Sequence, residues 1–123
     1  MTKIKRWASS SPGRSRIVAH KNLIWVVSTV SNVPEFEKEI KECLKLLEKS
    51  LLDAGSDKEH ILSIQVILRN IEYKNLFDSI WLQWIGLDPN NWPQRSVIGA
   101  ILTPGLEIEI VATALKYNKP EIL

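Results

Sequence analysis

The 123-residue sequence contains only one cysteine, two histidines and five glycines. The single cysteine, Cys43, rules out a disulfide framework within the chain and a zinc site built on several cysteines. His20 and His60 lie far apart in the sequence and neither begins a His-x-x-x-His spacing, so we expect no bound metal. The glycines do not gather into a loop that could cradle a phosphate, so we expect no nucleotide cofactor.

Long apolar runs are also missing. No stretch approaches the roughly 20 apolar residues of a membrane span, so we expect no membrane partner. The basic residues near Met1 are followed by serines and a proline, which is not the pattern of a secretory signal, and we expect a cytoplasmic location. A composition with 45% hydrophobic and 24% charged residues is typical of a folded domain. We expect one domain over residues 1–123.

Positive charge is concentrated at the start of the chain. The net charge is +2, but residues 1–34 carry six basic side chains and no acidic one, while the remainder carries ten basic and fourteen acidic side chains. Such a segment could bind a nucleic acid or form a solvated basic edge. The isoelectric point of 8.7 lies below the value of about 9 that nucleic-acid-binding domains usually exceed. We therefore favour the solvated edge and expect no nucleic-acid partner.

Two segments have helical periodicity and the others favour strands. Pro34 fits the first turn of a helix that Gly55 ends, with one apolar stripe that includes Cys43. A second, aromatic stripe follows Asn70 and includes Trp81 and Trp84. Cys43, these two tryptophans and Trp25 are predicted to be core residues. The predicted strands cover residues 4–7, 15–20, 23–29, 61–68, 94–102 and 106–115, with a hairpin turn at Lys21-Asn22 in which the asparagine adopts positive φ.

This order of elements predicts a two-layer α/β domain with both helices on one face of a single mixed sheet. The apolar run 23–27 suggests a central strand covered on both faces. The face without helices would carry Val97, Ile101 and Val111, so the pattern predicts self-association. We further predict that the last two strands pair around residues 103–105. Arg95 and Glu107 would then lie on adjacent strands, which in most proteins is a plain ion pair.

Four stretches resemble the reactive-intermediate imine deaminase family, also called the Rid or YjgF family. They are residues 55–58 (Gly-Ser-Asp-Lys) leading into Ile61-Leu62, 81–84 (Trp-Leu-Gln-Trp), 93–97 (Pro-Gln-Arg-Ser-Val) and 106–112 (Leu-Glu-Ile-Glu-Ile-Val-Ala). The Pro-x-Arg strand followed by a Glu-Ile strand is the family's signature. The resemblance runs from about Ser15 to Leu115 and is closest to a divergent branch.

The resemblance implies a chorismate mutase-like fold and a homotrimer with clefts between subunits. It also implies hydrolysis of 2-enamine and 2-imine acids, such as 2-iminopropanoate and 2-iminobutanoate, to 2-keto acids and ammonia, without a cofactor. Arg95 matches the arginine that holds the substrate carboxylate, and Glu107 matches the glutamate that activates water. The backbone carbonyl of Val97 matches a contact with the substrate nitrogen. Glu109 shares a strand face with Glu107, and only the family alignment selects Glu107.

The sequence also departs from the family pattern. Ser15 lies close to the position of a family tyrosine, Ser28-Thr29-Val30 replaces Ser-Gly-Gln, and Asp78 replaces a helix asparagine. We expect Ser15 and Ser28 to line the substrate pocket. Two alternatives to a deaminase remain. One is a non-catalytic trimer that binds small carboxylates through Arg95. The other is an RNA-directed role as a translation inhibitor or endoribonuclease, for which the basic first third is the supporting feature.

Overall fold

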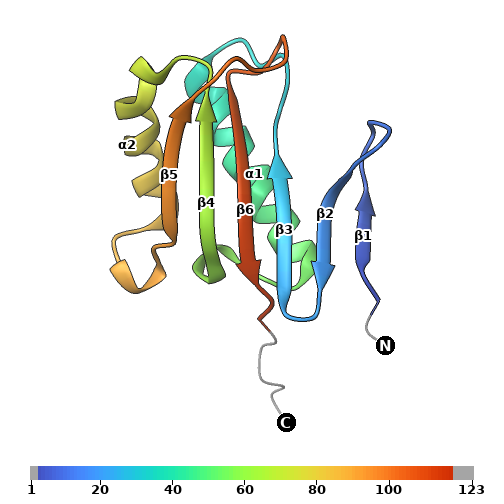
Figure 1. The fold of residues 1–123 in the computed structure, drawn as a ribbon. Helices are drawn as coiled ribbons and strands as arrows, with labels where there is room; N and C mark the ends of the chain where they lie inside the picture. Colours follow the sequence, from blue (N-terminus) through green and yellow to red (C-terminus); the bar gives the residue numbers. More distant parts are fainter. Residues whose placement is uncertain (1–2, 118–123) are drawn as a thin grey trace.

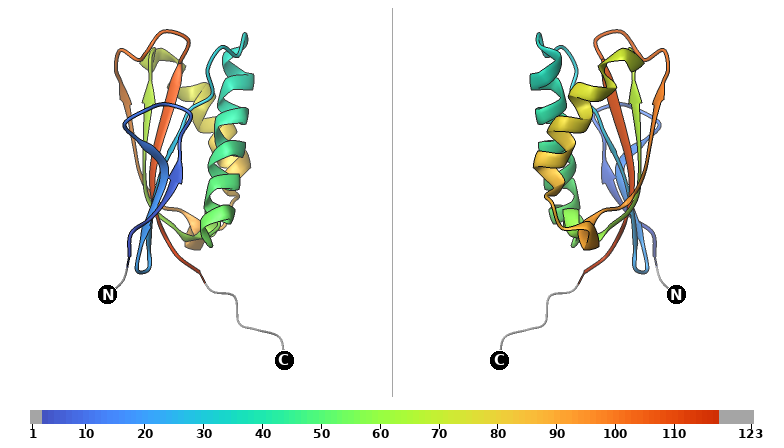
Figure 2. Two further views of the ribbon diagram at one scale, coloured as in Figure 1. Left: turned by 90° about the vertical axis from the view of Figure 1, so that its right-hand side faces the viewer. Right: turned by 90° about the vertical axis from the view of Figure 1, so that its left-hand side faces the viewer.

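The computed structural model describes residues 3–117, which form one six-stranded sheet with two α-helices packed on the same face (Figure 1). The side views show the two layers clearly, with sheet on one side and both helices on the other (Figure 2). This confirms the predicted two-layer α/β fold with a mixed sheet. The strands are β1 (Lys5–Ala8), β2 (Ser15–His20), β3 (Leu23–Ser28), β4 (Ile61–Leu68), β5 (Gln94–Gly99) and β6 (Ile108–Leu115), and the helices are α1 (Phe36–Ala54) and α2 (Lys74–Ile85).

The order of strands in the sheet is β1-β2-β3-β6-β4-β5. β4 and β5 are parallel and are joined through α2, whereas the other neighbours are antiparallel. The prediction that β5 pairs with β6 is wrong, because β6 lies between β3 and β4 and leaves β5 at the edge of the sheet. A turn signal shows that the chain reverses direction. It does not show which strand lies beside the returning one.

Helix α1 buries the predicted apolar stripe against the sheet. Ile40, Cys43 and Leu47 are fully buried, and the helix ends at Gly55, whose φ of 90° suits glycine. The helix begins at Phe36, so Pro34 lies before it rather than in its first turn. The hairpin between β2 and β3 is confirmed, although the residue with positive φ is Lys21, at 55°, and not the asparagine that follows.

One face of the sheet is left open in the single chain. Along β3, Ile24 and Val26 are buried under the helices, whereas Trp25 and Val27 on the other face are 40% and 47% exposed. The predictions that this strand is covered on both faces and that Trp25 is a core residue are therefore wrong for one chain. Val97 was also placed on the open face, but it packs against the core, and its neighbour Ile98 is exposed instead. Among residues 3–117, no helix has the length and apolar character that crossing a bilayer requires.

Burial predicts that the thiol of Cys43 is unreactive. Desolvation raises its pKa to about 12, and its sulfur donates a hydrogen bond to the backbone carbonyl of Ser28. At pH 8 only about one thiol in ten thousand is then ionised, and the thiolate is the reactive form. We expect no reaction of the native protein with a disulfide reagent within minutes, and one equivalent after unfolding in guanidinium. Rapid labelling of the native protein would contradict this packing.

Candidate functional site

Arg95 is held at the start of the edge strand β5, where it pairs with Ile64 of β4. Its side chain extends toward the helix layer and lies over two aromatic rings of α2, 5.6 Å from the centre of Phe77 and 5.7 Å from the centre of Trp81. A guanidinium on aromatic faces gains cation–π attraction and keeps a defined plane. The side chain as a whole is 22% exposed, so Arg95 is not sealed in the core.

Asp78 of α2 is the ionic partner of Arg95. One oxygen, Oδ1, lies 2.7 Å from Nη2 of Arg95, and the other, Oδ2, accepts a hydrogen bond of 2.7 Å from Lys74. Oδ1 is buried but receives no well-directed hydrogen bond, so its contact with Arg95 is an ion pair. Burial acts to raise the pKa of the Asp78 carboxyl, but the contacts and charges of Lys74 and Arg95 outweigh it and hold the pKa below 3.8, its ordinary value.

This lowered pKa predicts a stability difference that depends on pH. A carboxyl whose pKa is lower in the folded state stabilises the fold fully above its ordinary pKa and loses that contribution as pH falls through the lowered value. We compare wild type with Asp78→Asn by urea unfolding. The wild-type advantage is expected to stay constant from pH 8 to pH 5 and to shrink only below pH 3.8. If the difference in free energy of unfolding between wild type and Asp78→Asn instead changes near neutral pH, a group other than Asp78 causes the pH dependence.

Glu107 lies at the other end of the sheet, just before β6. Its side chain is 48% exposed, and Oε1 is 3.5 Å from Nε of Arg69. Arg69 also fixes the preceding loop, because its guanidinium donates to the backbone carbonyls of Leu102, Thr103 and Leu106 at 2.7, 2.8 and 3.0 Å. The backbone that presents Glu107 is therefore tied to the end of β4.

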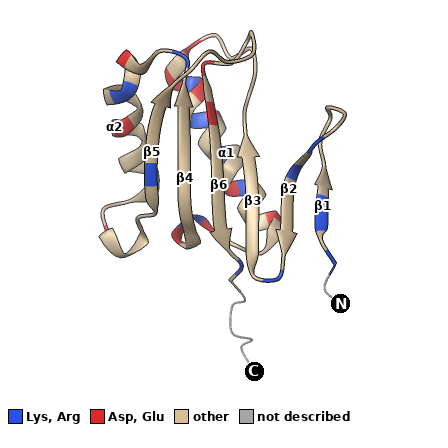
Figure 3. Ribbon diagram, viewed as in Figure 1, with Lys and Arg blue, Asp and Glu red and all other residues tan. Residues whose placement is uncertain are grey.

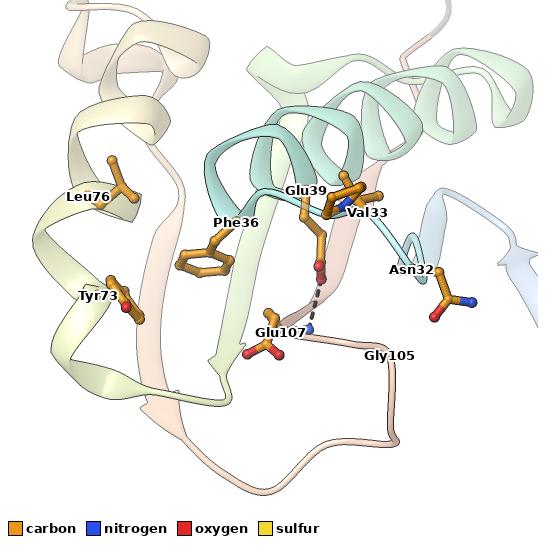
Figure 4. Close-up of a pocket in the computed structure, with 9 residues that line it drawn as sticks. Asn32, Val33, Phe36, Glu39, Tyr73, Leu76, Gly105 and Glu107 are labelled. Atoms are coloured by element: carbon orange, nitrogen blue, oxygen red, sulfur yellow. Dashed lines mark hydrogen bonds between the residues drawn. The ribbon is translucent and has the colours of Figure 1, made fainter.

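Glu39 holds the same backbone from the helix layer. It is a glutamate on the buried side of α1, and one of its carboxyl oxygens accepts a 2.8 Å hydrogen bond from the backbone N–H of Glu107 (Figure 4). The same oxygen accepts a 3.2 Å hydrogen bond from the backbone N–H of Ile108. Glu39 is only 1% exposed. The start of β6 is thus secured by a buried side chain from a segment about 70 residues earlier.

A cavity of about 540 Å³ opens beside Glu107. The side chains of Phe36, Tyr73 and Leu76 form its apolar wall, and Glu39 and Glu107 provide carboxyl groups (Figure 4). Glu109 is not among the residues that line it. This placement favours Glu107 over Glu109 as the glutamate that a bound molecule would meet.

Within one chain the structure does not bring Arg95 and Glu107 together. The register aligns Arg95 with Ile64 and then with Ala112, five positions along β6 from Glu107, which is about 17 Å of extended strand. Arg95 also extends over Phe77 and Trp81 of α2, whereas Glu107 lies beside Arg69, just before β6 begins. The expected juxtaposition depended on the incorrect pairing of β5 with β6. The single chain therefore holds these two side chains in separate places.

The other predicted ligand-binding residues lie in three different places. Ser28 is fully buried, and its hydroxyl donates a 2.8 Å hydrogen bond to the carbonyl of Cys43, so in the single chain it faces α1 rather than a cavity. Ser15 is half-buried and pairs with Ala8 of β1. Val97 lies two residues from Arg95 on the edge strand, where one side of the backbone is not used by β4.

Sequence reasoning missed Glu39 and Arg69. Glu39 could have been found, because it is three residues after Phe36 and four before Cys43, and therefore lies within the apolar stripe of the helix. A charged residue at such a position needs a buried partner. Arg69 carries no comparable signal, since its partners are backbone carbonyls of a loop more than 30 residues away.

Comparison with known proteins gives a consistent result. Residues 25–116 match the family described as endoribonuclease L-PSP. A RutC family protein of Haemophilus influenzae is 29% identical over 104 residues, which are 81% of this chain and 88% of the relative. A RutC family protein of Haemophilus ducreyi is 33% identical over 78 residues, 63% of this chain and 65% of the relative.

Solved structures share the fold. A YjgF-family protein of Neisseria meningitidis superposes with a TM-score of 0.85 at 24% identity, covering 94% of this chain and 97% of its own. A protein of Entamoeba histolytica, described provisionally as an endoribonuclease L-PSP, gives 0.82 at 19% identity, covering 92% and 99%. At these identities the likeness concerns architecture alone.

Proposed function

The chain belongs to the endoribonuclease L-PSP family, also called the YjgF or Rid family, and from this premise we propose that it hydrolyses reactive 2-imino and 2-enamino acids. The products are 2-keto acids and ammonia. Water adds its oxygen to the C=N carbon and the C–N bond then breaks, so the reaction needs no oxidant and no electron carrier. The requirements are a group that holds the substrate carboxylate, and a group that takes a proton from water and returns it to the leaving nitrogen.

The observation that carries this proposal is the setting of Arg95. Its guanidinium rests on Phe77 and Trp81 and is partly exposed, which leaves planar N–H donors for a carboxylate. Guanidinium and carboxylate match as a two-pronged hydrogen-bonded pair, and such pairs give both affinity and orientation. A small acid bound there would be fixed in plane, with its neighbouring carbon in a constant position.

Glu107 is the proposed acceptor of the water proton. It lies on the rim of the cavity and its backbone is fixed by Glu39 and Arg69. A carboxylate can accept a proton from water as a new C–O bond forms and later return it to the departing nitrogen. Because free imines already hydrolyse readily, holding substrate and water together would supply much of the required acceleration.

We propose that the two groups meet across an interface between copies, as in a homotrimer. The open face of the sheet exposes Trp25, Val27 and Ile98, which is the kind of surface that subunits bury. A cyclic arrangement would give each site an arginine from one copy and a glutamate from the next. The small 2-imino or 2-keto acid would then bind between subunits.

The direct test couples the protein to an enzyme that generates imines. A dehydratase acting on threonine or serine releases 2-iminobutanoate or 2-iminopropanoate, and semicarbazide traps the free imine. Adding wild-type protein is expected to suppress the trapped product in proportion to its concentration. Absence of suppression, with 2-keto acid still bound in a titration, would contradict the deaminase proposal and favour the carboxylate-binding alternative.

The RNA-directed alternative has weaker support from the structure. Basic positions do follow β1 and β2 along one edge (Figure 3). Arg16, however, already lies 3.4 Å from Asp53 and donates to the hydroxyl of Ser50. Partial neutralisation of this edge agrees with the solvated role. Binding of RNA with a steep inverse dependence on salt would be needed to reverse this preference.

A further inference from the structure

We propose that Asp78 and Arg95 act together as a clamp for a zwitterion, so that the substrate is recognised as a protonated 2-imino acid. The carboxylate of the ligand would lie on Arg95 and its cationic N–H on Asp78. This inference rests on the proposed function for the identity of the ligand. It adds a specificity-determining residue and assigns a protonation state to the substrate.

The first observation is that Asp78 already binds two cations at once. Oδ1 is next to the guanidinium of Arg95, and Oδ2 accepts from the ammonium of Lys74, each at 2.7 Å. The inner oxygen is buried, so Oδ2 is the one that a ligand could reach. Its present occupant shows that a protonated nitrogen is accommodated at this position.

The second observation is that the occupant of Oδ2 is replaceable. Lys74 is four residues before Asp78 on the same helix, and its side chain is 45% exposed. Exposed pairs of this kind contribute little to stability, because the lysine side chain loses entropy and both charges remain well solvated. A cationic nitrogen delivered by a ligand that is also anchored at Arg95 would displace Lys74 without breaking a buried contact.

The third observation is that only one nitrogen of the Arg95 guanidinium is paired with Asp78. Nη2 is engaged with Asp78, while the other guanidinium nitrogens donate no hydrogen bond to any residue from 3 to 117. An anionic position and a cationic position therefore adjoin within one ion pair. After Lys74 is displaced, the charges of Arg95 and Asp78 sum to zero, which complements a ligand of no net charge better than a simple anion.

This arrangement distinguishes substrate from product. A protonated imine nitrogen carries two N–H groups, one for the expected backbone carbonyl of Val97 and one for Asp78. The 2-keto acid carries an oxygen at the same position, which cannot donate and which a carboxylate repels. Hydrolysis would therefore convert a favourable contact with Asp78 into an unfavourable one and promote release of the product.

The test uses stable probes and needs no turnover. 2-Aminobutyrate is a zwitterion that stands in for the protonated imine, and 2-oxobutyrate is the anionic product. We measure the dissociation constant of each probe for wild type, Asp78→Asn and Glu72→Gln by calorimetry. Glu72 is an exposed acid near the start of α2 and gives a matched loss of one negative charge.

We expect wild type to bind 2-aminobutyrate at least tenfold more tightly than 2-oxobutyrate. Asp78→Asn should weaken the binding of 2-aminobutyrate and strengthen the binding of 2-oxobutyrate. The ratio of the two dissociation constants should therefore change at least tenfold, whereas Glu72→Gln should leave this ratio unchanged. Equal weakening of both probes by Asp78→Asn would overturn the proposal, because it would show that Asp78 only positions Arg95. Failure of wild type to discriminate would also overturn it.

Lys74→Met keeps the test decisive if Asp78→Asn does not fold. Removing the competing ammonium should tighten 2-aminobutyrate severalfold, and an unchanged affinity would contradict the clamp. The outcomes also separate this inference from the deaminase proposal. If the protein hydrolyses imines but Asp78→Asn leaves the ratio of the two dissociation constants unchanged, only the clamp proposal is contradicted. If the protein discriminates between the probes but does not hydrolyse imines, the clamp is supported and the deaminase proposal is contradicted.

Discussion

Arg95→Ala is expected to lower kcat/KM for imine hydrolysis about 100-fold, because a charge-assisted, two-pronged contact with the substrate carboxylate contributes about 1.5–3 kcal/mol. The fold should survive, since Arg95 is a partly exposed residue of the edge strand and Asp78 keeps its contact with Lys74. Arg95→Lys keeps the charge but loses the planar fork, and an intermediate loss of about tenfold is expected.

The matched control for this prediction is Arg16→Ala. Arg16 is also an arginine on a strand with an ion pair to an aspartate on a helix, but it lies on β2, away from β5 in the order of strands. It should retain wild-type activity in the semicarbazide assay. Full activity in Arg95→Ala, or equal loss in both variants, would show that Arg95 does not hold the substrate.

Glu39→Ala is expected to destabilise the protein by about 2–4 kcal/mol. The substitution leaves the backbone N–H groups of Glu107 and Ile108 without their acceptor, and Ile108 is fully buried. Leaving buried donors unsatisfied costs about 1–3 kcal/mol each when no water can replace the partner. Urea unfolding followed by tryptophan fluorescence measures the loss directly.

Two controls make the Glu39 prediction specific. Glu37→Ala removes the same charge from the first turn of α1, but Glu37 is exposed, so a change of no more than about 0.5 kcal/mol is expected. Glu39→Gln retains an oxygen that can accept from both N–H groups, so its loss should be well below that of the alanine variant. Equal stability of Glu39→Ala and Glu37→Ala would mean that the contact with β6 is not important.

Much of the fold could be predicted because local patterns determine it. The stripe containing Ile40 and Leu47 fixed which side of α1 is buried, and the turn at residues 21–22 defined the hairpin. The position of β6 could not be obtained this way. Its sequence is compatible with either edge of β4, and the choice depends on contacts such as that of Glu39, which joins residues far apart in the chain.

The candidate site was predictable only as a set of residue types. Arg95 and Glu107 could be selected from their motifs, but their separation within one chain follows from the strand order, which the motifs do not contain. Val97 shows the same limit, because a shift of one residue in strand phase decides between core and open face. The proposed role of Asp78 depends on its contacts with both Arg95 and Lys74, and the sequence alone does not show the contact with Arg95.

The central claim is that Arg95 of one copy and Glu107 of another complete each site, and mixing two inactive variants tests it most directly. Arg95→Ala and Glu107→Gln, each expected to be nearly inactive alone, are unfolded together in equal amounts and refolded. In a closed ring with random mixing, about a quarter of the interfaces join an intact arginine to an intact glutamate. We predict recovery of about a quarter of wild-type activity. Mixed assemblies, verified by two different tags, that stay as inactive as either parent would contradict the account.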